Sequence, residues 1–402
     1  MDNKIFYYLR GITMITLALA GKPNCGKSTF FKAATLANVE IANYPFTTIN
    51  PNFGVAYVRT TCPCKGLQLT CGHCTDGNRF VPVNLIDVAG LVPDAHKGKG
   101  LGNQFLDNLR QADAILHIID ASGGTDSEGN PVGIGNHDPE EDIRFLIFEM
   151  TMWVHGILDK HWSRISRQSQ GKGAVIQQGI AETFTGLGIT TEDIRDIELK
   201  LKLDLVHATI EDLIPLCAEL VKISKPMLAV GNKFDEAPEI LRQKLAVENV
   251  AFASAASELA LRNAAGGHLI RYLPGDTEFA IMAEDTLSST QKAGLAKIAA
   301  VMKQCHGTGV QQAINRAVFE LLDMIVVYPV EDENHFCNKK GEVLPDAFLM
   351  KKGSTPHDLA YQVHTDIGKG FLYAVDARSK MRIRENHELK DGDIIKIVSA
   401  AK

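Results

Sequence analysis

The fold of this chain is decided by Gly21-Lys22-Pro23-Asn24-Cys25-Gly26-Lys27-Ser28, which fits the pattern G-x-x-x-x-G-K-[ST]. An apolar run, Ile15–Ala20, precedes this loop, and Lys27–Leu36 is predicted to form a helix. The glycines let backbone N–H groups face phosphate oxygens, and the N-terminus of the helix adds partial positive charge. A buried strand that leads through such a turn into a helix predicts the first unit of a parallel α/β sheet.

The side chains of this loop are predicted to bind the phosphates of a nucleotide and its metal ion. We expect Lys27 to reach the β- and γ-phosphates and the hydroxyl group of Ser28 to bind Mg²⁺. The predicted phosphate-binding residues of the loop are Asn24, Cys25, Gly26, Lys27, Ser28 and Thr29.

A second motif ends the apolar run Val81–Ile86, with an aspartate at position 87 and a glycine at position 90. We expect Asp87 to hold Mg²⁺ through water, and the N–H of Gly90 to sense the γ-phosphate. An aspartate and a glycine at this spacing are common in turns. The motif therefore indicates a nucleotide site only because it lies downstream of the phosphate loop.

A third motif, Asn232-Lys233-Phe234-Asp235, follows the apolar run Met227–Val230 and predicts which base is bound. The carboxylate of Asp235 can accept both the ring N1–H and the exocyclic amine of guanine, whereas adenine offers no such pair of donors. Lys233 can lay its aliphatic stem over the base, and Asn232 can brace the loop. Further downstream, a backbone N–H for guanine O6 is expected from Ser254, Ala255 and Ala256.

Changes in residue composition and in the spacing of apolar residues divide the rest of the chain into parts. A fourth apolar run, Ala114–Ile119, predicts another strand of the sheet, and Ser163–Gly173 is predicted to be the tip of a helical hairpin. The predicted parts are an N-terminal extension at 1–13 with Met14 as the functional start, a nucleotide-binding domain at 14–136 and 225–323, a coiled-coil-like helical insertion at 137–224, and a compact α+β module at 324–402.

The composition places few limits on function. The chain has 402 residues, 45% of them hydrophobic and 22% charged, and a formal net charge of -6, which argues against nucleic-acid wrapping by bulk charge. No apolar run approaches the roughly 18 residues that a membrane span requires. The start resembles no signal peptide, so we expect a cytoplasmic protein without a membrane partner.

Cysteines are concentrated in one short segment. Of the eight in the chain, four lie at Cys62, Cys64, Cys71 and Cys74. Four thiolates at this spacing can close a tetrahedral zinc site, but free or redox-active thiols fit a reducing compartment equally well. The scattered remainder does not resemble a secreted disulfide framework.

In this order the motifs resemble those of translational GTPases of the Obg family. The run 43–52 looks like the first switch segment of that family, and the glycine-rich stretch 90–105 looks like the second. Segments at 346–348, 352–355 and 389–393 resemble a TGS domain, and nearly the whole chain is similar to the YchF branch in its archaeal form. The resemblance implies a P-loop NTPase sheet with a helical insertion and a C-terminal ubiquitin-like, β-grasp TGS domain.

The resemblance also implies a function and partners. It implies a ribosome-associated nucleotide hydrolase that uses Thr48, with Thr47 the weaker choice, as the Mg²⁺ ligand of the first switch. We expect a monomer whose partners are GTP, GDP, the ribosome and ribosomal RNA. Many YchF relatives have lost the Asn-Lys-x-Asp signature and prefer ATP, whereas this chain keeps it, so we expect GTP. The alternatives are an ATP hydrolase of the same family and a non-catalytic, nucleotide-dependent ribosome- or RNA-binding adaptor.

The way in which water is activated is predicted least well. Ras-like enzymes place a glutamine after the Asp-x-x-Gly glycine, but this chain has Leu91 there, so intrinsic turnover should be slow. Asn24 either coordinates K⁺, as the resemblance suggests, or only braces the loop. His96 could position water, and His117 is more typical of a core residue. The predicted catalytic residues are Lys27, Asn24, Thr48 and His96.

Basic residues alternate near the C-terminus, at Arg378, Lys380, Arg382 and Arg384. In a strand, this period of two would place all four on one face of the terminal module. Such a face is suited to RNA phosphates, although a solvated sheet surface explains it equally well.

Overall fold

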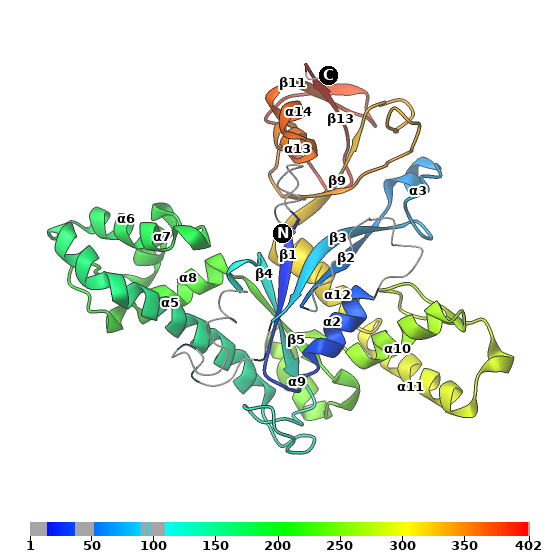
Figure 1. The fold of residues 1–402 in the computed structure, drawn as a ribbon, viewed down its shortest axis with the longest axis horizontal. Helices are drawn as coiled ribbons and strands as arrows, with labels where there is room; N and C mark the ends of the chain where they lie inside the picture. The colour runs from blue at the N-terminus through cyan, green and yellow to red at the C-terminus, as the bar shows by residue number, and fades with distance from the viewer. Residues whose placement is uncertain are drawn as a thin grey trace.

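A six-stranded sheet forms the centre of the protein, with strand order β2-β3-β1-β4-β5-β6 (Figure 1). The computed structural model describes residues 14–36, 52–88, 90, 94, 96 and 109–400. Strand β2 runs antiparallel to β3, and the other pairs are parallel. The strands are β1 Thr16–Ala20, β2 Phe53–Thr61, β3 Asn78–Asp87, β4 Ala114–Asp120, β5 Met227–Asn232 and β6 Ala251–Phe252.

The central strands are mainly apolar because both faces of the sheet are covered. Every residue of β1 and β4 is buried, which explains why apolar runs predicted them. Strand β2 lacks a continuous apolar run and was not predicted, because it lies at the edge of the sheet and its buried residues are separated by half-exposed ones. Its pairing, from Phe53 opposite Ile86 to Thr61 opposite Asn78, also extends β3 upstream of the predicted start at Val81.

Helices from both halves of the nucleotide-binding domain pack around this sheet. Helices α10 and α11, with the hairpin of β7 and β8, project to one side in Figure 1. The bounds are α2 Lys27–Thr35, α9 Glu239–Val247, α10 Ala255–Gly266, β7 Ile270–Arg271, β8 Ala280–Ile281, α11 Ser289–Cys305, α12 Val310–Asn315 and the π-helical turn Arg316–Leu321.

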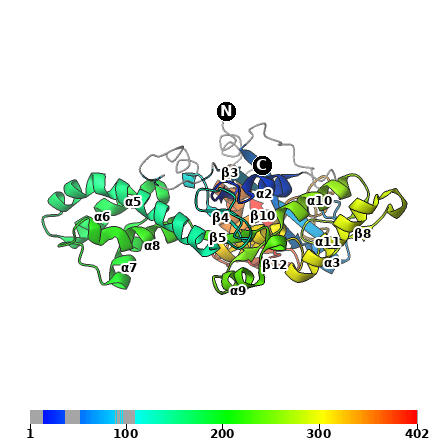
Figure 2. The ribbon, with the colours of Figure 1, turned by 90° about the horizontal axis from the view of Figure 1, so that it is seen from below.

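The helical insertion extends to the opposite side (Figure 2). Its long first helix, α5, begins at Pro139 after the cap Asp138, whose side chain accepts the N–H of Glu140, and carries acidic residues in its first turn. The predicted hairpin tip at 163–173 was placed too early, because α5 continues to Ser169 and the turn occupies only 170–172. The helices are α5 Pro139–Ser169, α6 Gly173–Thr183, α7 Thr191–Leu201 and α8 Ile214–Ser224.

The C-terminal module is a separate five-stranded sheet of order β10-β9-β13-β11-β12 with a core of its own. Strands β9 and β13 are parallel, helix α13 packs against the sheet, and helix α14 packs against α13. The elements are β9 Met324–Val330, β10 Phe348–Lys351, α13 Pro356–Val363, α14 Thr365–Lys369, β11 Phe371–Asp376, β12 Met381–Ile383 and β13 Ile394–Ser399.

The basic residues of this module do not form the predicted stripe. Strand β12 covers only Met381–Ile383, and the turn before it holds Arg378 and Lys380, the latter with a left-handed φ of 61°. The ammonium group of Lys380 lies 4.6 Å from the ring centroid of Phe336, and the guanidinium group of Arg382 lies 4.0 Å from that of Tyr373. Period-two spacing therefore did not indicate a common face here, because the chain turns between these residues.

A short excursion between β2 and β3, which contains the helix α3 Pro63–Leu67, reaches toward the C-terminal module (Figure 1). No helix in the described parts of the chain is long and apolar enough to cross a membrane.

Candidate nucleotide-binding site

The phosphate loop connects β1 to α2 through positions where only glycine fits. A Cβ atom on Gly26, which has a φ of 91°, would lie 2.2 Å from Nδ2 of Asn232. A Cβ atom on Gly21 would lie 2.2 Å from the backbone oxygen of Ile118. Cys25 between them is fully buried, and burial raises the pKa of its thiol to about 11. The loop backbone is therefore held closely against β4 and β5.

The predicted magnesium ligands meet at the start of α2. The hydroxyl of Ser28 donates to Oδ2 of Asp87 at 3.1 Å, and Nζ of Lys27 lies 3.4 Å from Oδ1 of Asp87. This Oδ1 is buried and accepts no hydrogen bond among the described residues. A hydroxyl group and a carboxylate with an unsatisfied oxygen are the hard oxygen ligands that Mg²⁺ prefers, and they lie next to the lysine that is predicted to bind phosphate. The residues therefore fit the ion that the sequence predicted.

Asn232 joins three segments at the predicted base-binding end. Its Nδ2 donates to the backbone oxygen of Cys25 at 3.0 Å, and its Oδ1 accepts the N–H of Ala255 at 3.0 Å. The side chain is 3% exposed, so both bonds are shielded from water. Asn232 thus braces the phosphate loop against the segment that begins α10, which is the role that the sequence suggested.

The other predicted base-contacting residues surround this brace. Asp235 lies exposed in a single helical turn, Phe234–Glu236, directly after β5. Ser254 caps α10 through its hydroxyl group and is buried, whereas Ala256 is exposed. An exposed carboxylate beside a rigid, buried frame is available to a ligand.

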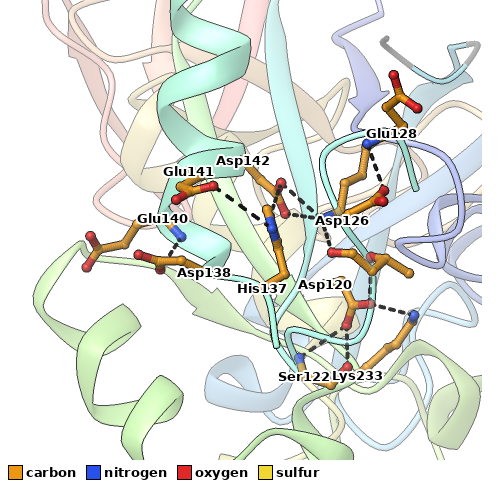
Figure 3. A network of polar contacts seen from close by, with 12 residues as sticks. Asp120, Ser122, Asp126, Glu128, His137, Asp138, Glu140, Glu141, Asp142 and Lys233 are labelled. Carbon is orange, nitrogen blue, oxygen red and sulfur yellow. Dashed lines mark hydrogen bonds and ion pairs between the residues drawn. The ribbon is translucent and has the colours of Figure 1, made fainter. Parts of the chain in front are cut away.

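Lys233 is held through its ammonium group. Its ammonium group lies 2.8 Å from Oδ2 of Asp120, a fully buried carboxylate at the end of β4. Burial alone would raise the pKa of Asp120, but hydrogen bonds from Lys233, Ser122 and Thr125 outweigh it and leave the pKa below its usual value. Asp120 therefore stays ionised and fixes the lysine (Figure 3).

A loop after β4, residues 121–138, lies against the phosphate loop, and sequence reasoning missed it. Nζ of Lys22 donates to the backbone oxygen of Thr125 at 2.8 Å, and Nδ2 of Asn24 donates to that of Gly129 at 3.0 Å. A Cβ atom on Gly129 would lie 2.6 Å from the backbone oxygen of Pro23. The only sequence signal was the density of glycines and polar residues between Asp120 and Asp138.

A buried ion pair connects the phosphate loop to the helical insertion. Nζ of Lys22 lies 2.7 Å from Oδ2 of Asp142 in the first turn of α5, and the two side chains are 2% and 6% exposed. Nε2 of His137 lies 2.9 Å from Oδ1 of the same aspartate (Figure 3). Burial raises the pKa of Asp142, against the opposing effects of Lys22 and His137.

The predicted water-positioning His96 is also tied to α5. Its Nδ1 lies 2.7 Å from Oε2 of Glu149, and this buried carboxylate also accepts the backbone N–H groups of Asp94 and His96. The ring therefore has a protein partner on one nitrogen. His117, in contrast, is buried in β4, and desolvation followed by the charge of Lys22 lowers its pKa to about 3, as expected of a neutral core residue.

Some predicted residues lie outside the described parts of the chain. They are Thr47, Thr48, Leu91, the remainder of both switch segments apart from 52, 90, 94 and 96, and the extension 1–13. Gly90 is described, and a Cβ atom there would lie 3.1 Å from Cγ of Pro23, so this glycine approaches the phosphate loop.

The four clustered cysteines come together within the β2–β3 excursion. Their sulfur atoms all lie within 4.8 Å of one another, with 3.8 Å between Cys62 and Cys71 and 3.5 Å between Cys64 and Cys74. All four are free thiols rather than disulfides.

Comparisons with known families agree with this geometry. The family described as "50S ribosome-binding GTPase" matches residues 16–147, and "Obg-like GTPase YGR210-like, G4 motif-containing domain" matches 230–332. The TGS domain family matches residues 334–399.

Relatives match along nearly the whole chain. An uncharacterized GTP-binding protein of Methanocaldococcus jannaschii is 48% identical, over 97% of this chain and 100% of its own. One of Schizosaccharomyces pombe is 35% identical, over 87% and 90%. The ribosome-binding ATPase YchF of Bacillus subtilis is 28% identical, over 90% and 87%.

A solved structure supports the fold directly. The crystal structure of a GTP-binding protein from Pyrococcus horikoshii OT3 superposes with a TM-score of 0.74 at 39% identity, covering 96% of this chain and 100% of that one. Together with the family matches, it confirms the predicted α/β P-loop fold with a C-terminal TGS domain.

Proposed function

This chain belongs to the Obg-like, YchF-related family of P-loop GTP-binding proteins, and from that premise we propose that it is a GTP-hydrolysing switch that binds the ribosome. The observation that carries the proposal is the frame around Asp235. Asn232 fixes the phosphate loop and the start of α10 relative to β5, while Asp235 stays exposed beside them. A carboxylate at this position can accept the pair of donors that guanine offers and adenine does not.

The phosphate end supports hydrolysis. Mg²⁺ held by Ser28 and Asp87 would neutralise charge on the phosphates. Lys27, held near Asp87 by their opposite charges, would place its ammonium group on the phosphate oxygens once nucleotide binds. Since residue 91 is a leucine, the chain has no glutamine after Gly90 to orient water, so we propose slow intrinsic turnover.

Calorimetric titration with GDP and with ADP tests the choice of base. We expect GDP to bind more tightly, because ADP leaves the carboxylate of Asp235 without donors. Equal or tighter binding of ADP would instead favour an ATP hydrolase, the activity in the name of the Bacillus subtilis relative.

Ribosome binding is supported by the names of relatives and by the TGS module. We expect the purified protein to sediment with ribosomes more strongly with a non-hydrolysable GTP analogue than with GDP. Equal sedimentation in both states would leave the non-catalytic adaptor as the better explanation. We propose that the protein acts in the cytoplasm as a monomer.

Potassium is proposed as an activating ion at Asn24. The amide nitrogen of Asn24 donates to the backbone oxygen of Gly129, which leaves the amide oxygen available to coordinate K⁺ near the phosphates. The bound K⁺ would neutralise the negative charge that develops during hydrolysis. We expect turnover to rise several-fold when K⁺ replaces Na⁺ at constant ionic strength.

Two variants separate this role from simple bracing of the loop. Asn24→Ala should remove the response to K⁺, whereas Asn24→Asp, which keeps an oxygen but loses the donor to Gly129, should retain it. Identical rates in the two salts for the unmodified protein would exclude the potassium role and leave His96 or the ribosome as the source of activation.

A structural zinc ion is proposed for the four cysteines. Tetrahedral coordination with Zn–S bonds of about 2.3 Å separates the sulfur atoms by about 3.8 Å, which agrees with the 3.8 Å and 3.5 Å separations of the two pairs. Four thiolates without histidine or carboxylate are typical of a structural rather than a catalytic zinc site.

A further inference from the structure

The segment that carries the four cysteines, residues 62–77, is called the cysteine hairpin below. It links the end of β2 to the start of β3 and is closed at its base by the N–H of Cys62, which donates to the backbone oxygen of Gly77 at 2.9 Å. Its only helix is α3, of five residues. Isolated helices of that length are unstable in water, so the hairpin needs another source of order.

The buried thiols are that source if they bind a metal ion. Cys62 and Cys64 are 0% and 4% exposed, and Cys71 is 6% exposed. The backbone N–H of His73 points to Sγ of Cys71 at 3.4 Å, a contact typical of structural metal sites, where it stabilises the charged thiolate. The cluster thus replaces a hydrophobic core that so short a segment cannot build.

The cysteine hairpin contacts the C-terminal module. Three of its cysteines belong to the same apolar cluster as Tyr328 of β9 and as Leu344 and Ala347 of the following loop. Figure 1 shows α3 on the side of the nucleotide-binding domain that faces this loop. The hydroxyl of Tyr328 is buried there with no hydrogen-bond partner among the described residues.

An arginine at the base of the hairpin holds the same loop. Arg79, the second residue of β3, is 4% exposed and donates to the backbone oxygens of Leu344 at 3.1 Å and Pro345 at 2.9 Å. The loop therefore shares an apolar cluster with the cysteines and is fixed by the arginine at the base of the hairpin.

From these contacts we infer that the cysteine hairpin is a metal-dependent dock, in which zinc bound by the four cysteines holds the C-terminal module on the nucleotide-binding domain. The inference rests on the zinc site proposed above. Without the metal, the four thiols no longer share a common ligand-bound ion, and the five-residue helix loses its support. The apolar packing of Leu344 and Ala347 would then be weakened.

The test is hydrogen exchange of the full-length protein before and after zinc is removed by a chelator, with zinc content measured on the same samples. We expect about one zinc ion per chain before treatment. After its removal, exchange in residues 336–347 should accelerate by about tenfold or more, while β11 and β13 inside the module stay protected. The double variant Cys71→Ser, Cys74→Ser should behave like the stripped protein.

Two further variants make the result specific. Arg79→Gln should keep its zinc but accelerate exchange in the same loop, because it removes two hydrogen bonds from the dock. Cys305→Ser, a thiol outside the cluster, should change neither quantity. Loss of zinc with unchanged exchange would overturn the dock and leave the zinc site in place.

A protein that is folded and zinc-free when purified without chelator would overturn both the zinc site and the dock. GDP titration on the same samples is independent of these outcomes. If such a zinc-free protein also binds GDP tightly, the proposed GTPase function stands although the dock does not.

Discussion

Replacing Asp235 with asparagine is expected to weaken GDP binding by about tenfold to somewhat over a hundredfold, because hydrogen bonds to a charged group contribute about 1.5–3 kcal/mol. The asparagine amide can no longer accept both N1–H and the exocyclic amine of guanine. It can instead donate to the extra carbonyl oxygen of xanthine. The variant should therefore gain affinity for xanthosine diphosphate while it loses affinity for GDP.

The matched control is Glu236→Gln. This neighbouring carboxylate is exposed in the same helical turn and carries the same charge, but the motif assigns it no base contact. It should leave GDP binding unchanged in the same calorimetric titration. If both variants lose affinity equally, the effect is one of general charge rather than of base recognition, and the assignment of Asp235 is wrong.

The second large effect is expected for stability. Lys22→Met should lower the free energy of unfolding by about 3–5 kcal/mol, the usual result of leaving one partner of a buried ion pair uncompensated. Asp142 would keep its hydrogen bond to His137 but lose the ammonium group 2.7 Å away, and Thr125 would lose a donor to its backbone oxygen. Urea unfolding of the nucleotide-free protein measures the change.

Two further variants interpret that result. Lys22→Met combined with Asp142→Leu should recover much of the lost stability, because both buried charges are then gone. Lys32→Met, which removes an exposed lysine of α2, should change stability by less than about 0.5 kcal/mol. A loss of under about 1 kcal/mol in the single variant Lys22→Met would mean that water reaches the pair and screens it.

The parts of the site that could be predicted are those written in short motifs at strand ends. Ser28 lies at the start of the helix that follows β1 and Asp87 lies at the end of β3. Each has a local signature, and parallel strands bring their carboxyl ends to one edge. Asn232 was recognised in the same way. Such residues are predictable because the spacing that positions them lies within a few residues of sequence.

The contacts that could not be predicted join residues far apart in the chain. Lys22 and Asp142 are 120 positions apart, and Arg79 and Leu344 are 265 apart. His96 with Glu149 is of the same kind. Nothing in the local pattern of either partner specifies the other, since each charged side chain looks like an ordinary surface residue until the fold buries it. The stripe at 378–384 failed for a related reason, because periodicity indicates a face only within one continuous element.

One consequence of helix α5 is mechanical. Asp142 and Glu149 are seven residues apart, two turns along one face, and one touches the phosphate loop while the other touches the segment after Asp87. Beyond Glu149 the helix continues for 20 residues to Ser169, a reach of about 30 Å at about 1.5 Å per residue. A tilt of about 5° at its base would swing the far end by about 3 Å. If the base of α5 tilts with the nucleotide, the insertion would act as a lever arm and turn small rearrangements near the phosphate loop into larger displacements at its tip.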